Sequence, residues 1–95
     1  MIGAKQLSMM KPSSYLINTA RIELTDEAAL TEAITNRKIA GAAFDDPPSC
    51  PSSPLLELPN VVFTPHLGNR AIEGMHAVFR CAVDNVLAVL KGRKP

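Results

Sequence analysis

The chain has 95 residues, of which 46% are hydrophobic and 20% are charged, as is typical of one small globular domain. Ten basic residues against nine acidic ones give a formal charge of +1, which excludes the strong positive field of a nucleic-acid or anionic-membrane binder. Two cysteines, Cys50 and Cys81, are too few for a disulfide scaffold and lack the spacing of a zinc site. With no signal peptide or membrane-length apolar run, we expect a cytoplasmic protein.

The first predicted elements are a short helix and a strand. Residues 1–11 favour a helix that ends before Pro12, because the residue before a proline is pushed out of the helical region. Residues 15–19 form a brief, partly β-branched apolar run, which is typical of a buried parallel strand.

A second helix and a second strand follow. Thr25 or Asp26 can cap a helix that continues to about Arg37. Residues 39–44 are apolar and small, which predicts a strand that a helix or a ligand approaches closely. Strand, helix and strand together form one βαβ unit.

The last third of the chain predicts a loop, a strand and a long helix. Residues 45–54 contain four prolines and three serines, which indicates an exposed loop, and one helical turn follows at 55–58. Residues 61–64 are the clearest strand, closed by Pro65. Residues 70–91 carry apolar side chains at helical spacing, and we expect this face to cover a sheet or another subunit. The predicted fold class is α/β, with about three parallel strands and a long C-terminal amphipathic helix.

Three chemically active side chains follow the predicted strands, namely Arg21, Asp45 and His66. Parallel sheets bind ligands at the carboxyl ends of their strands. There an arginine can clamp a carboxylate and a histidine can move a proton near neutral pH. Each residue also has a structural interpretation: Arg21 can solvate the sheet edge, His66 can cap the long helix or pair locally, and Asp45 can serve the turn before the prolines.

Several ordered segments of the chain resemble the D-isomer-specific 2-hydroxyacid dehydrogenases. The resemblance covers nearly the whole chain and is carried by residues 10–21, 26–30, 39–45 and 53–68. It implies the second half of that family's NAD-binding domain, with a partial Rossmann-type parallel sheet. Residues 1–95 are accordingly interpreted as a single partial NAD-binding domain.

The resemblance also implies roles for six residues. Arg21 matches the arginine that orients the substrate's carboxylate and carbonyl, and His66 matches the general acid/base that protonates the carbonyl oxygen. Asp45 matches the aspartate that meets the nicotinamide carboxamide of NAD or NADP. Positions that line the nicotinamide end of the cofactor match Thr19, Ala20 and Gly68. The implied substrate is a small 2-keto or 2-hydroxy acid, with no metal, nucleic acid or membrane involved.

The chain departs from the family pattern at four places. The family usually pairs its histidine with a glutamate five residues after the aspartate that matches Asp45, and Cys50 stands there. The usual Gly-Gly after the arginine is replaced by Ile22 and Glu23, which brings side chains and a negative charge to that turn. The glycine-rich fingerprint that cradles a pyrophosphate does not occur in these residues. The family's substrate domain has no counterpart in them either.

These departures leave three hypotheses. The chain is part of an NAD-dependent 2-hydroxyacid dehydrogenase, which by itself is expected to be inactive. Alternatively, it is a non-catalytic remnant that acts as an interaction module, either as a homodimer or bound to a longer relative. A third hypothesis is a fragment that does not fold stably alone, because half of a doubly wound sheet leaves an edge strand and an apolar helix face exposed.

Overall fold

The computed structural model describes residues 1–68 and 70–95 and has an α/β fold. The regular elements, in chain order, are helix α1 (Ala4–Leu7), strand β1 (Tyr15–Asn18), a 3-10 helix (Ile22–Leu24), helix α2 (Glu27–Thr35), strand β2 (Gly41–Phe44), a second 3-10 helix (Pro54–Glu57), strand β3 (Val61–Phe63) and helix α3 (Ile72–Leu90). Helix α1 is much shorter than the predicted helix over 1–11. Its last turn ends at Ser8, because the backbone of Met9 and Met10 bonds back to Gln6 and Leu7 in turns instead.

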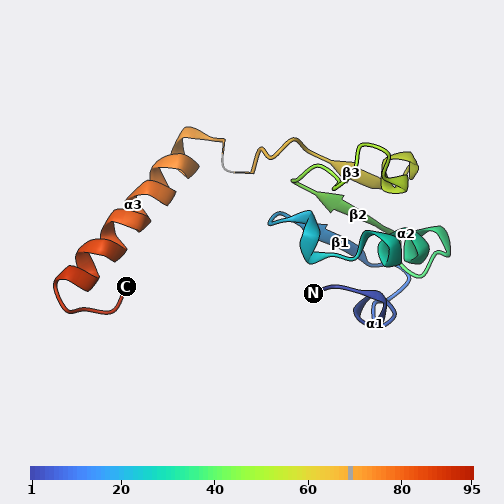
Figure 1. The fold of residues 1–95 in the computed structure, drawn as a ribbon, viewed down its shortest axis with the longest axis horizontal. Coiled ribbons are helices and arrows are strands. Elements are labelled where there is room, and N and C mark those ends of the chain that lie inside the picture. Colours follow the sequence, from blue (N-terminus) through green and yellow to red (C-terminus); the bar gives the residue numbers. More distant parts are fainter. Residues whose placement is uncertain (69) are drawn as a thin grey trace.

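The three strands form one parallel sheet in the order β1-β2-β3. Tyr15 lies beside Gly41, and Phe44 lies beside Phe63, where the two phenyl rings stack at a centroid separation of 5.3 Å. The strands run in the same direction, and their carboxyl ends lie on the side of the sheet that faces α3 (Figure 1). The predicted parallel sheet is therefore confirmed.

The core lies on one face of this sheet, where α1, α2 and both 3-10 helices cover it. Its fully buried members are Leu7, Ile22, Leu30, Ala33, Ile34, Ile39, Ala42, Phe44 and Leu55. The opposite face carries apolar side chains that remain exposed, namely Tyr15, Ile17 and Val62. Because successive side chains of a strand point to opposite faces, the alternating burial of β1 and β3 reflects a sheet that is covered on one side.

Helix α2 begins where the sequence predicts. The side chain of Asp26 caps it by accepting a hydrogen bond from the backbone nitrogen of Ala29 at 3.0 Å. The helix ends at Thr35, two residues earlier than predicted, because Arg37 takes a left-handed backbone conformation with φ of 54°.

Gly41, the first residue of β2, is approached closely by a neighbouring segment of the chain. A Cβ atom added to Gly41 would overlap the backbone carbonyl of Asn60 and would lie 3.1 Å from the ring of Tyr15. The segment at Asn60 and the ring of Tyr15 therefore leave no room for a side chain at position 41. The strand begins at Gly41 and not at Ile39, whose side chain is buried in the core.

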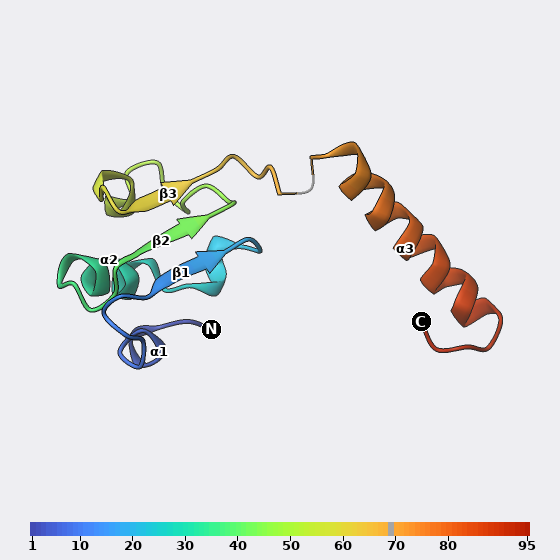
Figure 2. The ribbon, with the colours of Figure 1, turned by 180° about the vertical axis from the view of Figure 1, so that it is seen from behind.

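Helix α3 stands apart from the sheet in both ribbon views (Figures 1 and 2). None of its described side chains is buried, and the thiol of Cys81 is exposed. We expected the apolar face of α3 to cover a sheet or another subunit, and within the described residues this face does not cover the sheet.

Of the helices described, none has both the length and the apolar content that crossing a membrane requires.

Candidate active site

The six residues singled out in the sequence line one groove at the carboxyl ends of the strands, which we call the strand-end groove. It has a volume of about 370 Å³ and is lined by Thr19, Ala20, Arg21, Asp45, His66 and Gly68. They come from the loops after β1, β2 and β3, which meet because parallel strands present their carboxyl ends at the same edge of the sheet. The structure thus brings together residues that are up to 49 positions apart in the sequence (68 − 19).

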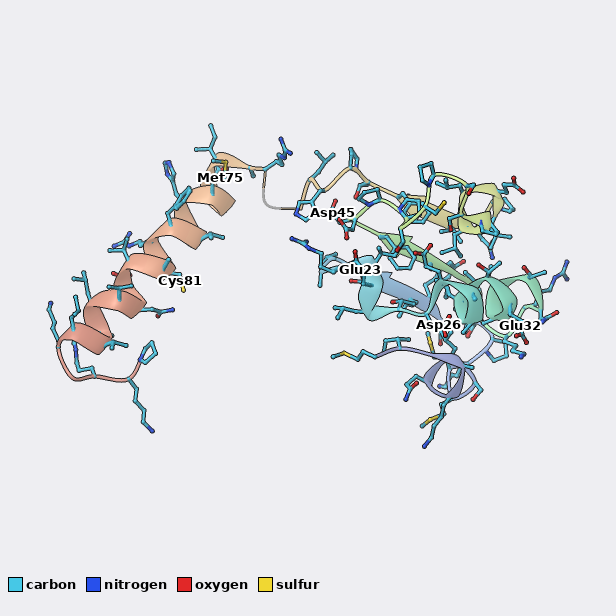
Figure 3. The ribbon with its side chains drawn as sticks, viewed as in Figure 1. Glu23, Asp26, Glu32, Asp45, Met75 and Cys81 are labelled. Atoms are coloured by element: carbon cyan, nitrogen blue, oxygen red, sulfur yellow. The ribbon has the colours of Figure 1, made fainter. Side chains whose placement is uncertain are left out.

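Asp45 lies at the beginning of the loop after β2 (Figure 3), and its carboxylate accepts three hydrogen bonds in this groove. Its Oδ1 atom accepts hydrogen bonds from the Thr64 hydroxyl at 2.5 Å and from the Leu67 backbone nitrogen at 2.7 Å. Its Oδ2 atom accepts one from the Gly68 backbone nitrogen at 2.6 Å. A carboxylate has about four acceptor positions, so one position of Asp45 stays available to a ligand.

The same contacts keep Asp45 ionised. The hydrogen bond from Thr64 lowers the pKa of the carboxyl below its usual range, and the backbone bonds from Leu67 and Gly68 and the nearby His66 add to the effect. Hydrogen bonds to the charged form of an acid favour that form. Asp45 therefore acts as an acceptor at neutral pH and is not a proton donor.

Asn18 shapes the turn that presents Thr19, Ala20 and Arg21. Its side-chain nitrogen donates to the carbonyl oxygen of Arg21 at 2.8 Å, and its side-chain oxygen accepts from the backbone nitrogen of Ala20 at 2.9 Å. Asparagine side chains commonly close turns through such local bonds. Asn18 was not predicted as a residue of this site, although an asparagine at the end of a strand is a turn signal.

Arg21 is exposed, and its guanidinium donates to the carbonyl oxygen of Ala20 at 2.8 Å. The salt bridges found within residues 1–68 and 70–95 do not include it, so its charge is open to an anionic ligand. The residues after it do not obstruct the groove: Ile22 points into the core with 1% exposure. Glu23 is exposed but is not among the residues that line the groove. The substitution of the family's glycines therefore adds no side chain to the groove lining.

His66 has a left-handed backbone, with φ of 57°. Such a conformation is uncommon for residues other than glycine and is concentrated at functional sites. The ring nitrogen Nδ1 lies 3.3 Å from Oδ1 of Asp46. Helix α3 begins only at Ile72, so His66 does not cap it, and its partner Asp46 is 20 residues away in the sequence rather than a local one.

A larger groove, of about 690 Å³, lies between α2 and the loop over 50–54. Two carboxylates, Glu27 and Glu32, line it, and none of the described residues lining it is an arginine, lysine or histidine. An acidic lining without a cation disfavours an anionic substrate. Cys50 belongs to this groove, where its thiol contacts the hydroxyl of Ser52 at 3.0 Å, and it does not line the strand-end groove. That hydrogen bond lowers the pKa of the exposed Cys50 thiol.

No cluster of three or more metal-binding side chains occurs within the part of the chain that the structure describes. Asp46 and Thr64 also shape the strand-end groove and were not predicted as residues of this site. Their roles follow from contacts between loops about 20 residues apart. The only signals for them in the sequence are that Asp46 follows another aspartate and that Thr64 ends the predicted strand over 61–64.

The chain is similar to several known proteins over nearly its whole length. It is 47% identical to the glyoxylate/hydroxypyruvate reductase B of Pectobacterium carotovorum subsp. carotovorum over 97% of the chain and 30% of that protein. The NAD-complexed D-isomer specific 2-hydroxyacid dehydrogenase of Lactobacillus delbrueckii ssp. bulgaricus has 35% identity and a TM-score of 0.68, with 100% of this chain and 34% of that chain covered.

A third similar protein is the NADPH-dependent glyoxylate/hydroxypyruvate reductase of Sinorhizobium meliloti in complex with NADP and malonate. It has 37% identity and a TM-score of 0.69, over 92% of this chain and 28% of that chain. The chain thus spans about 30% of the length of the curated relatives it matches. Residues 1–68 match the family model for the NAD binding domain of D-isomer specific 2-hydroxyacid dehydrogenases, and the chain therefore belongs to this family.

Proposed function

We propose that this chain provides one wall of the active site of an NAD(P)-dependent oxidoreductase that interconverts small 2-keto and 2-hydroxy acids. The observation that carries the proposal is the strand-end groove, which gathers a free cation, an imidazole and a carboxylate. Its volume of about 370 Å³ falls within the range of small-molecule pockets, about 300–1,000 Å³. The names of the relatives, glyoxylate and hydroxypyruvate reductases, agree with a small anionic substrate.

Arg21 and His66 are the proposed catalytic residues. The Arg21 guanidinium can hold the substrate carboxylate with two parallel hydrogen bonds, and its charge polarises the neighbouring carbonyl. His66 can donate a proton to the carbonyl oxygen in the direction of reduction and can take it back in the direction of oxidation. Both residues line the same groove, as this division of roles requires.

The nicotinamide side of the groove is proposed to consist of Asp45, Thr19, Ala20 and Gly68. The residues fit such a group, because the free acceptor position of Asp45 suits an amide NH₂ and because Gly68 presents backbone without a side chain. When bound, NAD or NADP supplies or accepts the hydride. The similar solved structures include one complexed with NAD and one complexed with NADP, so either cofactor is a candidate for this site.

We propose that completion of the site requires more surface than the described residues provide. We propose that these residues form a single partial cofactor domain, and that the glycine-rich phosphate-binding turn and the substrate domain are contributed by other sequence. The exposed sheet face at Tyr15, Ile17 and Val62 is an apolar surface of the kind that a larger protein covers.

A second candidate function is a non-catalytic interaction module that forms a homodimer or binds a longer relative. The observation in its favour is the apolar face of α3, on which Phe79 and Val83 are 65% and 57% exposed. We place either function in the cytoplasm, because the thiols of Cys50 and Cys81 are free and exposed, which suits a reducing compartment.

Thermal unfolding of the 95-residue chain, with and without millimolar NADH or NADPH, tests the proposal. A ligand that binds only the folded state raises the transition temperature. We expect one of the cofactors to raise it in the parent chain and in Arg80→Ala, a matched control on α3, and not in Asp45→Ala. We also expect a 2-keto acid such as glyoxylate to raise it further in the parent chain, and not in Arg21→Ala.

Turnover is a separate measurement. We expect no oxidation of NADH by the isolated chain with 2-keto acids, because residues 1–68 and 70–95 do not form a second wall that would exclude water from the groove. A transition that neither cofactor moves would overturn the proposal for this chain and favour the interaction module.

A further inference from the structure

Asp46 lies between the two loops that carry the proposed catalytic residues. Its Oδ2 atom accepts a hydrogen bond from the backbone nitrogen of Ile22, next to Arg21, at 3.2 Å. Its Oδ1 atom lies 3.3 Å from Nδ1 of His66. Since Asp46 itself belongs to the loop after β2, one carboxylate joins the loops that follow all three strands.

The Asp46 carboxylate is the sheltered partner of the pair. Its side chain is 16% exposed, whereas the His66 side chain is 44% exposed. A hydrogen bond to a charged acceptor is stronger than one between neutral groups, and shelter from water strengthens it further. The backbone nitrogen of Ile22 holds the Asp46 carboxylate in place. The carboxylate in turn holds one side of the half-exposed His66 ring.

No other carboxylate within the described residues takes this place. Asp45 is near His66, but its oxygens accept hydrogen bonds from Thr64, Leu67 and Gly68. The position at which the family resemblance implies a glutamate holds Cys50, whose thiol contacts Ser52.

The contact decides which ring nitrogen carries the proton. A carboxylate only accepts hydrogen bonds, so a bond to it requires a proton on Nδ1 of His66. In the neutral ring, Nε2 is then the unprotonated nitrogen, and it is the one that gains and loses a proton when the ring charges and discharges. A substrate in the strand-end groove would therefore exchange its proton with Nε2.

We infer that Asp46 is a positioning residue, which holds the His66 ring in the Nδ1–H tautomer and ties its orientation to the loop of Arg21. The inference rests on the proposed function, in which His66 transfers a proton and Arg21 binds the substrate. Asp46 would act through His66 and Ile22 without touching the substrate.

The ¹⁵N chemical shifts of the histidine rings in the 95-residue chain test the inference directly, because they distinguish the two neutral tautomers. At alkaline pH, where histidine rings are generally neutral, we expect His66 to carry its proton on Nδ1. His76, which is exposed on α3, serves as the internal reference for an unconstrained ring. A His66 ring protonated on Nε2, like a free histidine, overturns the inference without the need for any variant.

Two variants then assign the effect to the carboxylate. Asp46→Ala should convert His66 to the tautomer of His76, with loss of the Nδ1–H signal, whereas Asp84→Ala on α3 should leave His66 unchanged. Persistence of the Nδ1–H tautomer in a folded Asp46→Ala chain overturns the inference. If Asp46→Ala does not fold, as judged by its amide spectrum, the measurement on the parent chain decides.

The tautomer is measured without ligand, so the result does not depend on cofactor or substrate binding. A chain with the expected tautomer that binds neither cofactor nor glyoxylate would retain the inferred geometry and refute the proposed function. A chain that binds both with the other tautomer would retain the function and refute the role of Asp46.

Discussion

Asp45 and Gly68 lie so close together that the Asp45 carboxylate occupies the space that a side chain at position 68 would need. Oδ2 of Asp45 accepts a hydrogen bond from the Gly68 nitrogen at 2.6 Å, and a Cβ atom at position 68 would lie 2.7 Å from the same oxygen. The oxygen cannot move freely, because Thr64 and Leu67 hold the other half of the carboxylate. The glycine is therefore required by contact and not by backbone conformation.

Gly68→Ala is expected to separate Asp45 from the loop after β3 and to abolish the rise in transition temperature that the cofactor causes. The reason is that the added methyl group displaces the carboxylate which we propose as the nicotinamide partner. Thermal unfolding with and without cofactor checks this expectation. The control is Gly3→Ala, since the atom nearest to a Cβ at that position is 3.9 Å away. An unchanged cofactor response in Gly68→Ala would contradict the assigned contact.

Glu27 should make the stability of the chain depend on pH. Burial alone raises the pKa of its carboxyl, but hydrogen bonds from Ser49 and Ser53 outweigh this effect and hold the pKa below its ordinary value of 4.5. An acid whose pKa is lowered by folding stabilises the native state above its unfolded pKa. The contribution is therefore present above about pH 4.5 and is lost as the pH falls through the lower folded value.

Glu27→Gln tests this linkage. The two bonds, at 3.1 Å from the Ser49 nitrogen and 2.9 Å from the Ser53 hydroxyl, tie α2 to the loop after β2. We expect the variant to lose about 1–2 kcal/mol at pH 7 and to lose less than the parent chain on acidification. Urea unfolding at several pH values measures both. Glu57→Gln, at an exposed position, is the control, and equal acid sensitivity of Glu27→Gln and the parent chain would refute the linkage.

Leu30 is the best position at which to test the core. It is fully buried, with 0% exposure, on the face of α2 that packs against the sheet. Leu30→Ala should cost about 2–5 kcal/mol, through lost burial and the cavity left behind. Leu90→Ala, at a position that is 77% exposed, should cost under about 0.5 kcal/mol. Denaturant unfolding of the two variants compares them, and similar losses would show that the described core is not what stabilises the chain.

Self-association through α3 is a further expectation of the interaction-module function. Phe79 and Val83 lie one helical turn apart on its exposed apolar face. Double substitution of Phe79→Glu and Val83→Glu should convert an associating chain to a monomer, because a second copy would have to bury the new charges. Sedimentation velocity measures the change, with Asn85→Glu as the control. A parent chain that is monomeric at high concentration would remove the homodimer from consideration.

Much of the fold follows from local patterns. The structure confirms the type of element that each local signal predicts, namely a strand at the three apolar runs and a helix after the Asp26 cap and at the helical spacing of α3. These signals are local because strand and helix periodicity depend on neighbours in sequence. Element ends were less well predicted. α1 is shorter than expected, and α2 ends at Thr35, before the left-handed Arg37, since terminal turns depend on backbone bonds that no periodicity records.

The sequence by itself determined the family and the identities of the residues gathered in the strand-end groove, because ordered motifs keep their spacing in the chain. Only the tertiary structure decided which groups touch. Asp46 beside His66, Thr64 on Asp45, and Asn60 against Gly41 are contacts between segments about 20 residues apart. They depend on the register of parallel strands and the meeting of the strand-end loops, and both are properties of the folded sheet rather than of any short stretch of sequence.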